Sequence, residues 1–391
     1  MYRKQNKAIW VIWITAFIMT SGCSESRNEV KNKNDNKLTK RLVITDTLNI
    51  QLPDTITHLN NESRPFFSSD EKSFSYLTES FSDVMSLNRY SFEKNDWTVT
   101  RLHIQGPNQV YSLGAFSGEH DDGSFYYLPT IAPHILKVSS KGNVLENYEY
   151  SPNRDLAYNS QVKSPNIYDD GESIYFDLGE YRDLKNTSTF EEAYLIGAYN
   201  YKTNELKKLI HYPDEFRNKK WSTNDVGRNS VILKNRIYMS FSKSKKIYVY
   251  DLAGEFIKES EAGIDAIDES QGLESNDPFQ NALAQINNGY YHTLIYDKWQ
   301  KLFYRLAIHF DIENKISDPQ DLGRAFQKRT LTILTFDENL NIVSKDSFLT
   351  AKSFISEEFY LMLEDGLYLN LNTPSQPENE YSFIKLTLID Q

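Results

Sequence analysis

A short pattern recurs along the chain and limits what it can fold into: a tight-turn dipeptide followed by a strand rich in aromatic residues. Asp122-Gly123, Asp170-Gly171, Asn288-Gly289 and Asp365-Gly366 are the clear copies, and weaker ones lie near residues 71 and 235. Asp-Gly and Asn-Gly suit two-residue hairpin turns because Gly and Asn tolerate positive φ. A second hairpin follows most copies, so each unit predicts a four-stranded antiparallel meander.

The spacing of these units favours a closed ring. The turns recur about every 50 residues, except in two longer intervals that contain insertions at 178–192 and 311–330. A propeller blade takes ~40–50 residues. The last unit lacks a fourth strand, and the strand at 42–52 lacks a partner. We therefore predict an all-β fold over residues 41–391, a six-bladed β-propeller whose N-terminal strand closes the last blade. A seven-bladed ring and two β-sandwiches are the alternatives.

Short helical insertions are expected at two places. Asp318-Pro319 can cap and begin a helix that runs to Gln327, because Asp is a good N-cap and Pro suits the first helical position. Asp277-Pro278 has the same form and can begin another helix before Ile286.

The N-terminus predicts export. A basic start precedes an apolar run at 8–19, which is shorter than the roughly 20 residues that a spanning helix needs. Residues 1–22 therefore read as a signal peptide. The following Cys23, the only cysteine, resembles the lipobox cysteine of bacterial lipoproteins, although Thr20 stands where leucine is usual. An ordinary signal peptide with a chance cysteine and an uncleaved anchor helix are the alternatives.

Residues 23–40 are then a lipidated cysteine and a flexible tether, because 24–40 is polar and has only two aliphatic side chains, Val30 and Leu38. Two or more acyl chains would hold the protein stably on a membrane. We expect a lipid-anchored protein of the cell envelope, at the periplasmic or surface face of the outer membrane. A lipidated Cys23 also excludes disulfides and thiolate chemistry.

The formal net charge of -11 argues against a nucleic-acid partner, since such binding depends on basic residues that neutralise phosphates. Acidic surfaces mostly serve solubility and do not identify a partner.

The lipobox, the repeated turn units and the string from Tyr296 to Arg305 together resemble the TolB-like six-bladed propeller lipoproteins of unknown function found in Bacteroidota. The resemblance covers about residues 40–391. It implies a fold and a location, but no catalytic residues, because that family carries no established activity.

The sequence has no nucleophile elbow, no zinc-binding His-Glu-x-x-His and no glycine-rich phosphate loop. The paired acids at 121–122 and 169–170 are better explained by turn chemistry than by a cation site. We therefore expect no cofactor and no metal, and the sequence leans away from catalysis.

Four residues are candidates for ligand binding. Arg305 and His309 share one face of a predicted strand, and Asp297 lies one hairpin away, so they could line a pocket for an anionic or sugar ligand. The alternative is an Arg305–Asp297 pair that stabilises a blade beside a satisfied histidine. His134 lies in a loop between two strands, where ligand-binding residues are common.

Three functions remain open. The first is a binding or scaffolding module for protein or glycan partners, suggested by the tether and the lack of catalytic motifs. The second is a propeller enzyme that acts on glycans at an axial site, which requires acids or a histidine that converge at the ring centre. The third is a lipoprotein that senses a small ligand.

Overall fold

A computed structural model describes most of the chain after the predicted tether. The described residues are 38, 40–53, 65–67, 72–79, 85–103, 109–110, 114–120, 122–129, 132–151, 162–164, 167–178, 188–219, 221, 226–267, 280, 283, 287–310, 329–349, 354–372 and 379–391. The predicted signal peptide, Cys23 and the helix at 318–327 lie outside them.

The described strands form six sheets, antiparallel except for one added strand, which are the blades of a six-bladed β-propeller. We number the blades I–VI in chain order.

Blade I contains β2 (Phe66–Phe67), β3 (Ser73–Glu79), β4 (Met85–Ser91) and β5 (Asp96–Leu102); blade II contains β6 (Gly114–Glu119), β7 (Phe125–Pro129), β8 (His134–Val138) and β9 (Val144–Glu149). Blade III contains β11 (Ile167–Asp169), β12 (Ser173–Asp177), β13 (Tyr194–Asn200) and β14 (Glu205–His211). Blade IV contains β15 (Arg228–Leu233), β16 (Arg236–Phe241), β17 (Lys246–Asp251) and β18 (Phe256–Glu261), with β10 (Val162–Ser164) added parallel to β15. Blade V contains β19 (Tyr290–Asp297), β20 (Leu302–Phe310), β21 (Arg329–Asp337) and β22 (Ile342–Leu349). Blade VI contains β23 (Phe354–Leu363), β24 (Gly366–Asn372), β25 (Glu380–Asp390) and β1 (Lys40–Gln51).

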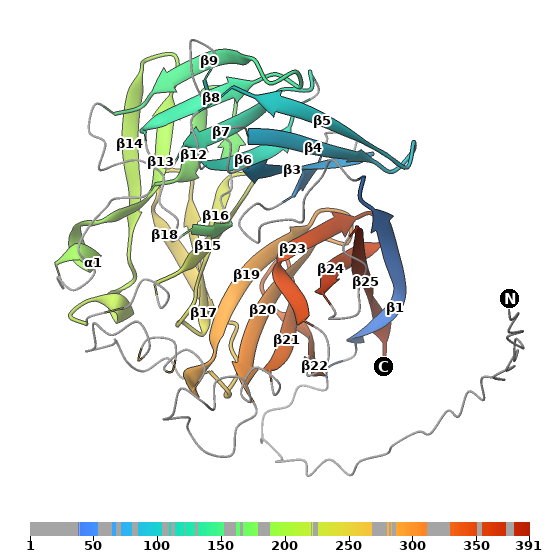
Figure 1. Cartoon of the computed structure of the whole chain (residues 1–391). Helices are drawn as coiled ribbons and strands as arrows, with labels where there is room; N and C mark the ends of the chain where they lie inside the picture. The colour runs from blue at the N-terminus through green and yellow to red at the C-terminus, as the bar shows by residue number, and fades with distance from the viewer. Residues whose placement is uncertain are drawn as a thin grey trace, which may run out of the picture. The chain divides into compact units, whose positions relative to one another are not determined.

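The first strand closes the ring, as the sequence predicts. β1 pairs antiparallel with β25 from Lys40 opposite Asp390 to Gln51 opposite Glu380. Figure 1 shows β1 beside β25, with the C-terminus near the start of β1. This pairing supplies the fourth strand that the last unit lacks, and it covers an edge that would otherwise expose unpaired backbone groups.

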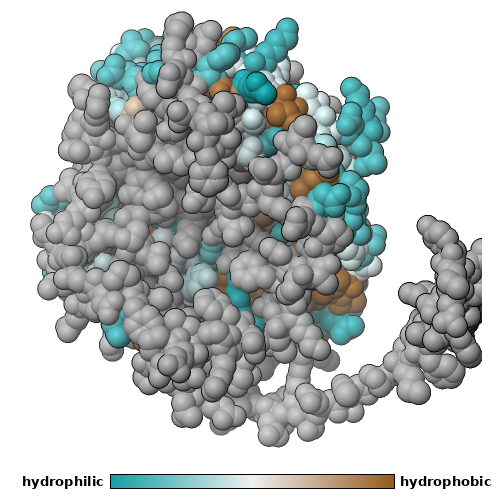
Figure 2. Space-filling model, viewed as in Figure 1, coloured by the Kyte–Doolittle hydropathy of each residue, from teal (hydrophilic) through white to brown (hydrophobic). Residues whose placement is uncertain are grey.

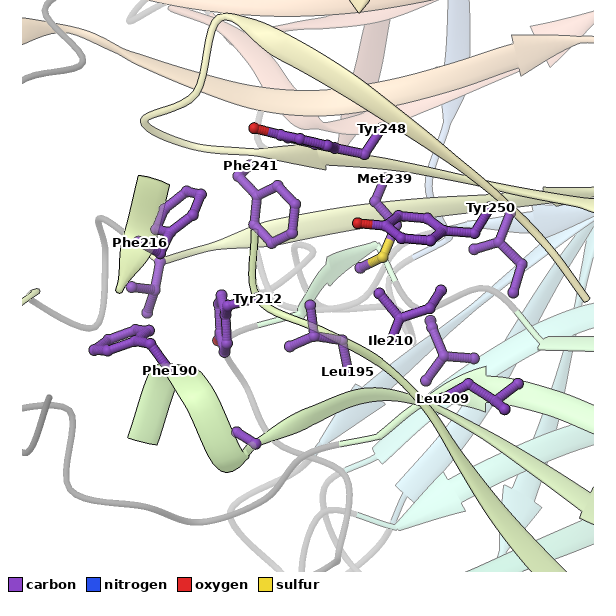
Figure 3. Packing of buried hydrophobic residues seen from close by; sticks show 14 of the residues in the cluster. Phe190, Leu195, Leu209, Ile210, Tyr212, Phe216, Met239, Phe241, Tyr248 and Tyr250 are labelled. Atoms are coloured by element: carbon purple, nitrogen blue, oxygen red, sulfur yellow. The ribbon is translucent and has the colours of Figure 1, made fainter. Parts of the chain in front are cut away.

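The hydrophobic core is divided into six clusters, one between each pair of consecutive blades. Figure 3 shows the cluster between blades III and IV, where aromatic rings of Phe190, Tyr212, Phe216 and Phe241 gather. Tyr212 and Phe216 lie 5.9 Å apart, and Phe216 and Phe241 lie 5.0 Å apart, between ring centroids. Strands of aromatic residues suit this arrangement because both faces of every blade are buried against a neighbour.

The meander topology gives the ring two different faces. The turns that join the first strand to the second and the third to the fourth lie at one face, which we call the hairpin face. The second-to-third connections and the links between blades lie at the other, which we call the link face. Side-chain oxygens cap the hairpin turns: Asp251 Oδ1 accepts hydrogen bonds from the backbone N of Ala253 and Glu255, both at 2.9 Å.

Most predicted hairpin turns are confirmed, and one is wrong. Gly123 and Gly171 have φ of 75° and 88°, the left-handed region that their turns require. Asn288-Gly289, however, precedes β19, and the turn between β19 and β20 lies at Lys298–Lys301. The dipeptide signal is local, so it cannot distinguish a turn inside a blade from one that leads into it.

The helical content is small. Among the described residues, α1 (Thr189–Glu192) ends the insertion at 178–192, and a 3-10 turn, η2, covers Asp214–Phe216. The sequence did not predict α1 or η2. Residues 280, 283, 287 and 288 are also helical, in the region where the sequence predicts a helix after Asp277-Pro278. Within the described ranges, no helix has the length and apolar character needed to cross a membrane.

Candidate functional site

Arg305 holds blade V to blade IV. It lies in β20 and is fully buried. Its Nε donates to Ser240 Oγ at 2.9 Å and its Nη1 to the carbonyl oxygen of Ala262 at 2.8 Å. Its Nη2 donates to the carbonyl oxygens of Phe241 and Ser244 at 3.2 and 2.6 Å. These four acceptors belong to blade IV or to the segment that leaves it, so oxygen dipoles of the neighbouring blade help to balance the guanidinium charge.

Tyr291 of β19 extends this contact. Its ring centroid lies 3.7 Å from the guanidinium carbon of Arg305, a cation–π contact between two buried side chains. Its hydroxyl accepts a hydrogen bond from the backbone N of Ile264 at 2.8 Å. A Cβ at Gly263 would lie 2.4 Å from Lys245 Cγ and 2.8 Å from the Tyr291 hydroxyl, so the link between blades IV and V needs glycine at that position.

Asp297 does not pair with Arg305. It is fully buried at the hairpin end of β19, where Oδ1 accepts hydrogen bonds from the backbone N of Trp299 and Gln300, both at 2.9 Å. Arg305 stands opposite Leu294 in the register, three positions from Asp297 along β19. Burial raises the pKa of the Asp297 carboxyl above its usual value, although the backbone hydrogen bonds oppose this shift. The carboxyl therefore caps a turn.

The two candidate histidines lie in different parts of the ring. His309, near the link-face end of β20, has Nε2 3.1 Å from Thr332 Oγ1. His134 begins β8 in blade II, and its Nδ1 lies 2.8 Å from Asn147 Oδ1. Blades III and IV separate His134 from His309. Of the four candidates, Arg305 and His309 share β20, whereas Asp297 lies at the hairpin face and His134 in another blade.

A buried polar contact that the sequence did not indicate joins blades III and IV. Asp177 ends β12 and is fully buried; Ser230 Oγ donates to its Oδ2 at 2.9 Å. Arg228 Nε lies 4.0 Å from Asp177 Oδ1, and Arg228 Nη2 donates to the carbonyl oxygen of Leu178 at 2.6 Å. The buried carboxylate and guanidinium thus balance each other across the interface.

The intervening residue, Asn229, points to blade V instead. Its Nδ2 donates to the carbonyl oxygen of His292, whose own Nδ1 lies 2.7 Å from Thr293 Oγ1. Because side chains alternate along a strand, β15 sends polar groups to both neighbouring blades. The polar run Arg228-Asn229-Ser230 before an apolar stretch was the available sequence signal, but it does not reveal the partners.

These groups form cross-links between blades III, IV and V. Among the described residues, no three of His, Cys, Asp and Glu are grouped so that they could hold a metal ion. The bonds of Arg305 and Arg228 fix strand positions at the interfaces where they occur. The ligand-binding roles of His134, Asp297, Arg305 and His309 stay predictions.

Comparison with known proteins agrees with this fold. The sequence model of the family described as Domain of unknown function (DUF4221) matches residues 39–344. A crystal structure of a DUF4221 family member from Bacteroides vulgatus superposes with a TM-score of 0.74 at 16% identity, covering 90% of this chain and 99% of that chain. A protein of Bacteroides fragilis named "Putative exported protein" superposes with a TM-score of 0.54 at 9% identity, covering 92% of this chain and 98% of that chain.

No curated protein matches the sequence. At these identities the likeness to solved structures concerns the fold. The family model, in contrast, covers most of the chain and includes β1 and most of the predicted ring. The expected resemblance to a propeller family of unknown function is therefore confirmed. The chain belongs to the DUF4221 family.

Proposed function

We propose that this protein is a lipid-anchored binding module of the cell envelope, in which a rigid propeller presents a surface to a protein or glycan partner. The observation that carries the proposal is that the buried guanidinium of Arg305 bonds to neighbouring strands of the ring. Arg305 directs its guanidinium to four oxygen acceptors of a neighbouring blade. A group so fixed is suited to holding strands in place, which is what a scaffold requires.

Two further observations support the location. The N-terminal sequence combines a basic start, an apolar run and Cys23. The Bacteroides fragilis neighbour, which shares the fold, carries a name that refers to export. Export and lipidation of this chain follow from its own sequence features and remain part of the proposal.

Lipidation is tested by metabolic labelling with an alkynyl palmitate analogue in cells that express the full chain. We expect the wild type to carry the label and to sediment with membranes, and Cys23→Ser to lose both properties. Cys23→Ser is a matched control because the substitution removes one sulfur and leaves the apolar run intact. Equal labelling of both proteins would exclude Cys23 as the lipid attachment site.

Binding is tested with Cys23→Ser protein and two envelope fractions, one of polysaccharide and one of outer-membrane proteins. We expect saturable binding to one fraction, loss of binding after heat denaturation of the protein, and no new reducing ends in the polysaccharide. Release of reducing ends that grows with time would instead support the glycan-cleaving alternative. Saturable binding of a small ligand alone would support the sensor.

A further inference from the structure

The start of β1 has a defined place on the ring. In blades I–V, a hairpin turn joins the third strand to the fourth at the hairpin face. In blade VI the third and fourth strands are β25 and β1, and the chain ends replace that turn: Lys40 lies opposite Asp390, and Gln391 Nε2 donates to the Lys40 carbonyl oxygen at 3.1 Å. β1 therefore begins at the hairpin face.

Exposed large apolar side chains gather at the same face. Six are exposed among the described residues: Ile44, Val99, Leu145, Phe256, Ile257 and Ile342. Four of them come within the first two positions of a fourth strand, directly after a hairpin turn: Leu145 in β9, Phe256 and Ile257 in β18, and Ile342 in β22. The Phe256 side chain is 56% exposed even though its ring lies 5.8 Å from that of Tyr250 between centroids. Exposed phenyl surface is costly in water.

Three of these four side chains form one arc with the start of β1. Phe256 and Ile257 belong to blade IV and Ile342 to blade V, which are neighbours. Lys258 Nζ of β18 donates to the Asn339 carbonyl oxygen in the turn before β22 at 2.9 Å. Blade V in turn contacts the start of β1 in blade VI, where the Leu42 backbone N donates to Asp346 Oδ2 of β22 at 2.7 Å.

Basic residues flank the arc where the tether joins it. Lys40 and Arg41 are exposed at the start of β1, and Lys31, Lys33 and Lys37 precede them in the sequence. Basic side chains beside exposed aromatic and aliphatic ones suit the interface of an anionic membrane. Figure 2 shows hydrophobic and hydrophilic residues side by side along the edge of the molecule that carries β1 in Figure 1.

We propose that the hairpin-face arc of Phe256, Ile257 and Ile342 rests on the lipid surface that holds the anchor, so that the link face points away from the membrane. The inference rests on the proposed lipidation of Cys23. The occupant is the bilayer itself, because the start of β1 at Lys40, which the predicted tether precedes in the sequence, lies at the hairpin face next to this arc. The link face is then the surface that partners can reach.

The test compares two dye positions on blade IV. Ala253, in the turn before β18, and Ala266, in the link after it, are both exposed and lie at opposite ends of that strand. A strand of 6 residues separates the two faces by about 20 Å. Lipidated full-length Ala253→Cys and Ala266→Cys proteins are labelled with an environment-sensitive dye and placed on vesicles of phosphatidylcholine and phosphatidylglycerol that carry a headgroup quencher.

We expect at least threefold stronger quenching at position 253 than at position 266. Replacing Phe256, Ile257 and Ile342 with serine should bring the two values together while the protein stays folded and anchored. Val99→Ser is the matched control, since Val99 is exposed and apolar but lies in blade I. Equal or reversed quenching in a protein that carries the palmitate label would overturn this orientation and leave the lipid anchor intact, whereas absence of the label would overturn the anchor itself.

Discussion

Two blade interfaces of this propeller are held by different chemistry. Between blades VI and I, Phe74 is fully buried, and its ring lies 5.6 Å from that of Tyr90, 5.7 Å from that of Trp97 and 6.4 Å from that of Phe359. Between blades IV and V, Arg305 adds directional hydrogen bonds to an apolar cluster. The first interface depends mainly on area and shape, beside a hydrogen bond from Trp97 Nε1 to the Gln51 carbonyl oxygen at 2.7 Å. The second sets several backbone oxygens of one blade around a single guanidinium of the other.

The difference has a physical consequence. Aromatic packing is less strictly directional than a hydrogen bond, so a ring can be exchanged for another apolar side chain of similar volume at modest cost. A buried guanidinium and its acceptors require each other, because loss of one leaves the others unpaired in a dry interface. The closing interface should therefore tolerate conservative substitution better than the interface that Arg305 holds.

The largest effect is expected for Arg305→Met, which keeps an unbranched apolar stem and removes the charge. The carbonyl oxygens of Ala262 and Ser244 lose the guanidinium as a donor, and that of Phe241 keeps a long hydrogen bond of 3.4 Å from the Ser244 backbone N. We expect the free energy of unfolding to fall by about 3–5 kcal/mol. Urea unfolding followed by tryptophan fluorescence measures this loss.

Arg305→Lys serves as a control for charge alone. Lysine keeps the positive charge but lacks the planar guanidinium that reaches several acceptors. We therefore expect Arg305→Lys to lower the free energy of unfolding by most of the amount expected for Arg305→Met. A loss below about 1 kcal/mol for Arg305→Met would show that the carbonyl contacts contribute little and would remove the contrast between the two interfaces.

A smaller effect is expected for Phe74→Leu at the closing interface. Leucine preserves most of the buried apolar area and leaves a small cavity among the surrounding rings, so we expect a loss of about 1–2 kcal/mol in the same urea experiment. Phe74→Ala should cost about 3–5 kcal/mol because it removes the whole ring. If Phe74→Leu lowers the free energy of unfolding as much as Arg305→Met does, the aromatic interface tolerates substitution no better than the polar one.

The smallest effect is expected for Asp297→Asn. Burial raises the pKa of Asp297, so the folded protein binds more protons than the unfolded chain between the ordinary pKa of aspartate and the raised value. The contribution of this residue to stability therefore falls as pH rises through that window. Asparagine keeps the capping oxygen without the charge, so we expect a gain of up to about 1 kcal/mol at pH 7.

Below the ordinary pKa of aspartate, Asp297 is protonated in both states, so the gain in Asp297→Asn should disappear there. Stability measured from pH 3 to pH 7 checks this. A variant that is less stable than the wild type at pH 7 would mean that the ionised carboxylate is needed at the turn.

Much of the fold could be predicted from local sequence. Asp170-Gly171 and Asp365-Gly366 identify turns between adjacent strands because the backbone conformation that they favour is local. The unpaired strand at 42–52 indicated closure, and it pairs with β25. Asn288-Gly289 gave a wrong turn position for blade V, because the same dipeptide also suits the segment that leads into the first strand of a blade.

The candidate site was less predictable. Alternation along β20 correctly placed Arg305 and His309 on one face, but the partners of Arg305 lie about 43–65 residues away in the sequence. No pattern in the sequence connects such residues. The same holds for Asp177 and Ser230, which are 53 residues apart and hydrogen-bonded across two blades.

The sequence by itself indicated the meander units and the need for an outside strand to complete the last one, because turn dipeptides and aromatic alternation act over a few residues. It left open whether the ring has six or seven blades, and the tertiary structure decided for six. The tertiary structure decided which charged side chains cross the blade interfaces. It also decided that Asp297 caps a turn while Arg305 reaches blade IV, and that β1 begins at the hairpin face. These features depend on contacts between residues far apart in the chain, which form only when the ring closes.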